Sequence, residues 1–182
     1  KDGKPVQGWN VHEVQIYDER PEKLHFMTKY SLGTPGCRPV ETGQAKWTFQ
    51  PDGGLYLWIS PQLCRQESEV ALCLTVPQWM ERLDVEYCGS AGPGHSGQVG
   101  DEMGIWLSNV QWASVTNIAG LGLYFESDRA MSIRLQDFQT EDGVERRLYL
   151  CPARTKGKDC HLHIQPILKD DGGVCYEAGG CH

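Results

Sequence analysis

Apolar and polar residues alternate along many short segments of this chain. The alternation is clearest over residues 11–16 and 160–164, where it places side chains of opposite polarity on the two faces of an extended strand. The 21 glycines and 10 prolines separate such segments and leave no room for long helices. The pattern therefore predicts an all-β chain. Strands are expected at residues 9–17, 24–30, 45–49, 55–59, 70–76, 83–87, 105–112, 121–125, 131–135, 147–150 and 161–167.

Two segments have a different pattern. Residues 78–83 follow Pro77 and are consistent with one short helix, because proline is favoured in the first turn of a helix. Residues 89–104 contain six glycines and are expected to form a flexible loop or a linker between two halves of the chain.

The spacing of the expected strands, about 8 to 12 residues, is typical of β-sandwiches and β-barrels. With 182 residues the chain is long enough for one domain with its own hydrophobic core. We therefore expect a single β domain over residues 1–182, either a β-trefoil or a β-sandwich.

Eight cysteines include two triplets with the same spacing, 9 and then 15 positions. The triplets lie 87 residues apart and suggest a duplication into half-repeats around residues 37–88 and 105–181. An even number of cysteines at this density is typical of oxidising compartments, so we expect a secreted protein with four disulfides. No Cys-x-x-Cys pair occurs, which disfavours structural zinc. The cysteines are Cys37, Cys64, Cys73, Cys88, Cys151, Cys160, Cys175 and Cys181.

If the duplication is real, equivalent cysteines should pair alike. The expected disulfides join Cys73 to Cys88, Cys160 to Cys175, Cys37 to Cys64 and Cys151 to Cys181.

The sequence as it begins at Lys1 shows no secretory leader. For a secreted protein, we expect that the leader has been removed.

The charge of the chain bears on its partners. The formal net charge is −7, and the longest basic run is Arg146-Arg147. Nucleic acids and anionic membranes need a concentrated positive surface, so neither is expected, and neutral or weakly cationic partners fit better. No apolar run approaches the roughly 18 residues of a membrane span, so membrane insertion is not expected.

About 45 residues are similar to one repeat of the ricin-type β-trefoil lectins. Gln44 and Trp47 stand where that family has Gln-x-Trp, with one residue more between them. A glycine turn at 52–55, a Cys-Leu-x-Val strand at 72–76 and a strand ending at Cys88 follow in the family's order. The resemblance implies a degenerate trefoil with lectin-like, carbohydrate-binding function.

The early strand at residues 9–14 supports a second resemblance. Together with the even cysteine count and the acidic charge, it is similar to small secreted β-rich fungal proteins, both allergens and plant-infection effectors. This resemblance implies recognition of a host or partner protein instead of a glycan.

Signatures of common enzymes are absent from the sequence. It contains no Gly-x-Ser-x-Gly, no phosphate-binding glycine loop and no His-Glu-x-x-His. No catalytic residue and no cofactor is therefore expected, and binding is favoured over catalysis. Neighbouring carboxylates are interpreted as solvated surface charges, namely Glu67 with Glu69, Asp101 with Glu102, and Asp170 with Asp171.

The alternative is a small extracellular enzyme that uses a metal ion. On a strand, His161 and His163 point to the same face with Cα atoms about 6 to 7 Å apart, so both could ligate one ion. The sequence places no third ligand beside them, so two surface histidines are the favoured interpretation.

Six tryptophans are available for packing and for binding. Trp47 and Trp58 lie in apolar segments near cysteines and are expected in the core. The binding residues are expected to be the tryptophans that lie beside amides or charges, together with those amides, because amphipathic rings suit both sugars and protein surfaces. They are Trp79, Trp106, Asn109, Gln111 and Trp112.

Overall fold

The computed structural model describes residues 9–20, 22–33, 36–39, 41–63, 71–89, 94, 96–98, 104–153 and 158–168. Within these ranges the regular elements are all strands, so the all-β prediction is confirmed. The described residues contain no helix that is long and apolar enough to cross a membrane. The strands are β1 (Trp9–Arg20), β2 (Lys23–Leu32), β3 (Glu41–Phe49), β4 (Leu55–Leu63), β5 (Leu72–Val76), β6 (Arg82–Tyr87), β7 (Ser96–Gln98), β8 (Ile105–Thr116), β9 (Gly122–Thr140), β10 (Gly143–Pro152) and β11 (Cys160–Ile167).

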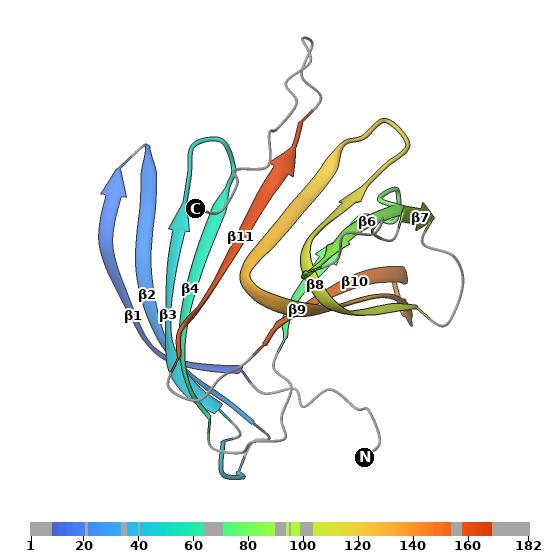
Figure 1. Ribbon diagram of the computed structural model, residues 1–182. Coiled ribbons are helices and arrows are strands. Elements are labelled where there is room, and N and C mark those ends of the chain that lie inside the picture. The colour runs from blue at the N-terminus through green and yellow to red at the C-terminus, as the bar shows by residue number, and fades with distance from the viewer. Residues whose placement is uncertain are drawn as a thin grey trace.

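All of these strands belong to one antiparallel sheet (Figure 1). Their order is β1-β2-β3-β4-β11-β9-β8-β6-β7, and β10 joins this path from the side, between β9 and β5. The sheet is not closed. The expectation of a trefoil or a sandwich is therefore not confirmed.

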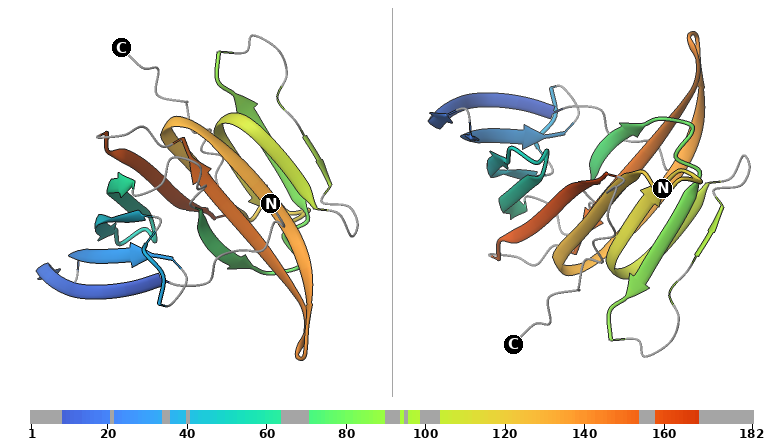
Figure 2. Two further views of the ribbon diagram at one scale, coloured as in Figure 1. Left: turned by 90° about the horizontal axis from the view of Figure 1, so that it is seen from below. Right: turned by 90° about the horizontal axis from the view of Figure 1, so that it is seen from above.

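The sheet divides at β9. One edge of β9 pairs with β8, whereas the other edge pairs first with β11, at residues 122–127, and then with β10, at residues 131–140. β9 bends between these two halves (Figure 1). Figure 2 shows the β1–β4 strands on one side of the molecule and the β8–β10 region on the other, with β11 between them.

Strand β8 follows the bend through two irregularities in its pairing with β9, between Leu107 and Trp112. Asn109 lies there with φ of 60°, a left-handed conformation that asparagine tolerates better than most residues. Because the irregularities shift the alternation, Val110 and Ala113 are both fully buried although three positions separate them.

Alternate apolar side chains form one hydrophobic cluster that contains residues from β2 to β11. We call the face that carries them the inner face and the opposite side the outer face. Fully buried members of the cluster are Leu83, Val110, Ala113, Val115, Phe125, Ile133, Leu135, Leu148 and Leu150.

Two expectations about local structure are wrong. Trp47 packs against the core, but Trp58 is half-buried on the outer face, because it falls on the alternate position of β4 between the buried Leu57 and Ile59. Residues 78–83 do not form a helix. They begin with a turn in which Met80 N–H donates to Pro77 O at 3.0 Å, and Arg82 already starts β6. The segment 89–104, which was expected to be a flexible loop or a linker, includes the short strand β7.

The expected disulfide between Cys73 and Cys88 is not formed. Cys73 lies on β5, which pairs with β10, whereas Cys88 follows β6, which pairs with β7 and β8. The two cysteines therefore belong to different branches of the sheet. Each of the other three expected bridges includes Cys64, Cys175 or Cys181, which lie outside the described residues.

Candidate functional site

Polar and aromatic side chains cross the outer face in a line from β4 to β6. In the strand register Tyr56 is opposite His163, His163 is opposite Glu126, Glu126 is opposite Trp112, and Trp112 is opposite Glu86. We call these five residues the transverse row. Neighbouring strands lie about 4.8 Å apart, so the row spans about 19 Å. The buried residues that alternate with the row along these strands hold it on the outer face.

Glu126 is at the centre of the row and accepts a hydrogen bond at each of its carboxylate oxygens. Tyr124 O–H donates to Glu126 Oε2 at 2.9 Å, and His163 Nδ1 lies 3.1 Å from Glu126 Oε1. On its other side the His163 ring stacks on Tyr56, with centroids 4.0 Å apart. The side chain of Glu126 remains 49% exposed, so the carboxylate is anchored and still open to solvent.

Trp112 links the two carboxylates of the row. Its indole N–H donates to Glu86 Oε2, and its ring lies against Tyr124 with centroids 5.8 Å apart and planes tilted by 32°. Burial raises the pKa of Tyr124, and the hydrogen bond to Glu126 and the negative charges of Glu126 and Glu86 raise it further. Both carboxylates therefore act on the same small region of the surface.

A second set of contacts lies beside the row. Lys46 Nζ is 4.5 Å from the centre of the Trp58 ring, and Trp58 Nε1–H donates to Asp159 Oδ2 at 3.1 Å. His161 is opposite Trp58, and its backbone N–H donates to Asp128 Oδ1 at 2.9 Å. One face of the Trp58 ring is therefore already occupied by a cation.

The predicted binding residues are separated by the bend in β8. Trp112 belongs to the transverse row, but Trp106 is opposite Arg134, on the other side of the bend. Asn109 forms the bend itself, where its Nδ2–H donates to Cys88 O at 3.2 Å. Gln111 is exposed next to Trp112.

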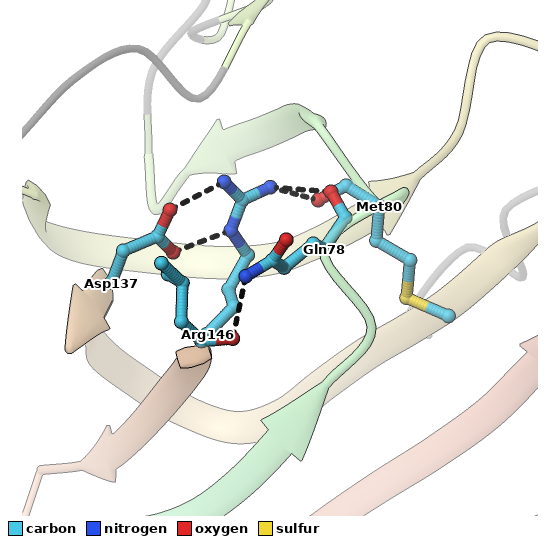
Figure 3. Close-up of polar contacts among 5 residues, drawn as sticks. Gln78, Met80, Asp137 and Arg146 are labelled. Atoms are coloured by element: carbon cyan, nitrogen blue, oxygen red, sulfur yellow. Dashed lines mark hydrogen bonds and ion pairs between the residues drawn. The ribbon is translucent and has the colours of Figure 1, made fainter. Parts of the chain in front are cut away.

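Trp79 lies apart from the row, in the turn between β5 and β6. It is 52% exposed, and Arg146 holds the turn in place (Figure 3). The guanidinium is bidentate to Asp137, at 2.7 and 2.8 Å, and Nη1–H donates to Gln78 O at 3.0 Å and to Met80 O at 2.8 Å. Because Arg146 is itself buried, these four contacts fix the backbone that carries Trp79.

His161 and His163 share the outer face, as alternation along β11 predicts. His163 is engaged with Tyr56 and Glu126, while His161 is exposed. Across the described residues no three histidine, cysteine, aspartate or glutamate side chains are grouped so that they could hold a metal ion.

Sequence reasoning missed Tyr56, Glu86, Tyr124 and Glu126. Each lies in a segment expected to be a strand or next to one, but they come together only through the strand order, in which β11 lies between β4 and β9 and β8 lies between β9 and β6. The available signal was the alternation that places Tyr124 and Glu126 on one face of β9, on either side of the buried Phe125.

Comparison with known proteins gives no further identification. The chain matches no protein-family model, and no curated protein matches its sequence.

Proposed function

We propose that this chain is a carbohydrate-binding, lectin-like β domain that holds a glycan against the transverse row. The observation that supports the proposal is the order of side chains across five neighbouring strands, in which the rings of Tyr56, His163 and Trp112 are interspersed with the carboxylates of Glu126 and Glu86. Rings contact the apolar faces of sugar units, and carboxylates accept hydrogen bonds from sugar hydroxyl groups.

The row is held in place before any ligand arrives. Tyr124 and Trp112 both donate to carboxylates, and His163 is fixed between a ring and a carboxylate. Side chains that are already ordered lose little conformational entropy on binding, which favours affinity. Tyr56, Glu126 and Glu86 are exposed, so the row is open to solvent, which suits an extended glycan chain better than a small, enclosed ligand.

The test compares two tryptophans on one strand. Trp112→Ala should weaken glycan binding at least tenfold, measured by calorimetry with oligosaccharides selected on a glycan array. Trp106→Ala is the matched control and should leave glycan affinity unchanged, because Trp106 lies on the other side of the bend. Equal effects of the two substitutions would contradict the assignment of the row.

A partner protein is the second candidate, at a different surface. Trp106 is 58% exposed, Arg134 lies 5.6 Å from the centre of its ring, and Tyr149 follows Arg134 in the strand register. Tryptophan, tyrosine and arginine are the residues that most often dominate protein interfaces. An effector-like function predicts the reverse of the glycan test, with loss of partner binding in Trp106→Ala and none in Trp112→Ala.

The eight cysteines support secretion for either function. A secreted chain with four disulfides should show almost no reactive thiol when it is titrated after denaturation without reductant. Two or more reactive thiols per chain would contradict the four disulfides and remove the main support for an extracellular location.

A further inference from the structure

We propose that the β9–β8–β6 end of the transverse row selects glycans whose sugar units carry positively charged amino groups. This inference rests on the proposed glycan-binding function and specifies the ligand class. It concerns three residues of the row, Glu86, Trp112 and Glu126, together with Tyr124, which lies two positions before Glu126 on β9. We call these four side chains the acidic end of the row.

The geometry of the acidic end places two carboxylates on either side of an aromatic pair. Trp112 is opposite Glu126 on one side and Glu86 on the other, so about two strand spacings separate the carboxylates along the row. The rings of Trp112 and Tyr124 lie between them, and both are partly exposed. A group placed over these rings is therefore within reach of both negative charges.

Both carboxylates lack a cationic partner among arginine and lysine residues of the described chain. Glu126 is bonded to Tyr124 and His163, and Glu86 is bonded to Trp112. Two other acidic residues of the outer face are neutralised: Asp84 forms an ion pair with Arg82, and Glu13 forms one with Lys29. The acidic end is thus a place where the surface holds two negative charges that a ligand could compensate.

The hydrogen bonds direct that charge at the rings. Trp112 and Tyr124 both donate their polar hydrogen to a carboxylate, so the exposed parts of the rings remain available to a ligand while their polar atoms are bound. Burial is the main cause of the raised pKa of Tyr124, and Glu126 and Glu86 raise it further, which agrees with a negative potential at this point. A cation over the ring faces is favoured by the ring electrons and by the two carboxylates.

An amino sugar combines the two features that this surface can recognise. Its ring has an apolar face that can stack on Trp112, and its ammonium group can donate to Glu86 or Glu126. A neutral sugar would cover the carboxylates without supplying a compensating charge, which costs free energy. The net charge of −7 also favours the approach of a cationic chain.

The test uses three oligosaccharides of equal length: a glucosamine oligomer, its N-acetylated form and a glucose oligomer. Binding is measured by calorimetry at a pH where the amino groups are protonated. The glucosamine oligomer should bind about tenfold more tightly than the other two, and this preference should decrease as salt is added.

Charge-removing variants show where the preference arises. Glu86→Gln and Glu126→Gln keep an oxygen that accepts from Trp112 or Tyr124, so the rings stay in place while one charge is lost. Each should abolish most of the preference for the glucosamine oligomer, because losing the charge weakens binding of that oligomer more than binding of the glucose oligomer. Glu13→Gln removes one charge from the outer face of β1, far along the strand order, and should keep the full preference.

The outcomes separate this inference from the proposed function. Equal binding of charged and neutral oligomers would overturn the selectivity and leave glycan binding intact. A preference that persists in both glutamine variants would also overturn it, because the charge effect would then arise elsewhere. If none of the three oligomers binds, the result would count against both proposals.

Discussion

The imidazole ring of His163 stacks on the phenol ring of Tyr56, with centroids 4.0 Å apart and planes inclined by only 6°. Tyr56 belongs to β4 and His163 to β11, so this contact joins the first four strands to the rest of the sheet on its outer face. The opposite side of His163 reaches Glu126 on β9. One side chain thus connects an aromatic and an acidic part of the proposed binding surface.

Replacement of His163 by alanine should weaken glycan binding by at least about fivefold. The substitution removes the stacking partner of Tyr56 and one hydrogen-bond donor to Glu126, and each such contact contributes about 0.5 to 1.5 kcal/mol. Calorimetric titration measures the effect. His161→Ala is the control, because His161 lies on the same face of β11 but makes no side-chain contact with the row in the described structure. Equal loss in both variants would show that the row has been assigned wrongly.

Replacement of Arg146 by lysine should destabilise the fold by about 2 kcal/mol, because a single ammonium cannot bind Asp137 at two atoms and also reach two backbone carbonyls. The free energy of unfolding is obtained from urea denaturation. We also expect the fluorescence of Trp79 to become more accessible to a soluble quencher, since Arg146 holds the turn that carries it. An Arg146→Lys variant as stable as the parent would mean that the turn does not depend on this network.

Acid should remove the contribution of Asp137 to stability. The hydrogen bond from Arg146 lowers the pKa of Asp137 in the folded state more than burial raises it. A lowered folded-state pKa gives stability that is fully present above the unfolded value of about 3.9 and is lost as the pH falls through the folded value. Melting temperatures of the parent and of Asp137→Asn should therefore differ by a constant amount near neutral pH and converge below about pH 4. A difference that widens in acid would contradict the sign of this shift.

Substitutions at Asn109 should depend on backbone conformation. With φ of 60° the residue is left-handed, so Asn109→Val should cost about 1 to 2 kcal/mol, whereas Asn109→Gly should be nearly neutral apart from the lost contact to Cys88 O. Thermal unfolding compares the two variants. If valine is tolerated as well as glycine, β8 can follow the bend without a left-handed residue.

Local pattern was sufficient to predict an all-β chain and the positions of most strands, although it missed β7 and divided β9 into two strands. The alternation in β11 correctly placed His161 and His163 on one face, with Leu162 buried between them. The same reasoning failed at residues 78–83, where the turn is set by Arg146, a residue more than 60 positions away that binds the carbonyl oxygens of Gln78 and Met80. Long-range polar contacts of this kind leave no local trace in the sequence.

The candidate site was harder to predict than the fold. The sequence predicts both Trp106 and Trp112 as binding residues, but the bend at Asn109 separates them. Glu86 and Trp112 are 26 positions apart, and Glu126 and His163 are 37 apart. Only the strand order brings them into one row, and strand order depends on the packing of the whole chain.

The position of β11 also has a consequence for how the chain assembles. Among the described strands, β1 to β4 are linked to the others only through β11, which pairs with β4 on one side and β9 on the other. β11 is the last of these strands along the chain. During synthesis on a ribosome, the edge of β4 would therefore stay unpaired until residues 160–167 emerge. The pairing of β4 with β11 joins residues that are about a hundred positions apart in the sequence. An exposed strand edge can pair with other chains, so the interval before β11 arrives is when a nascent molecule is most prone to misassembly.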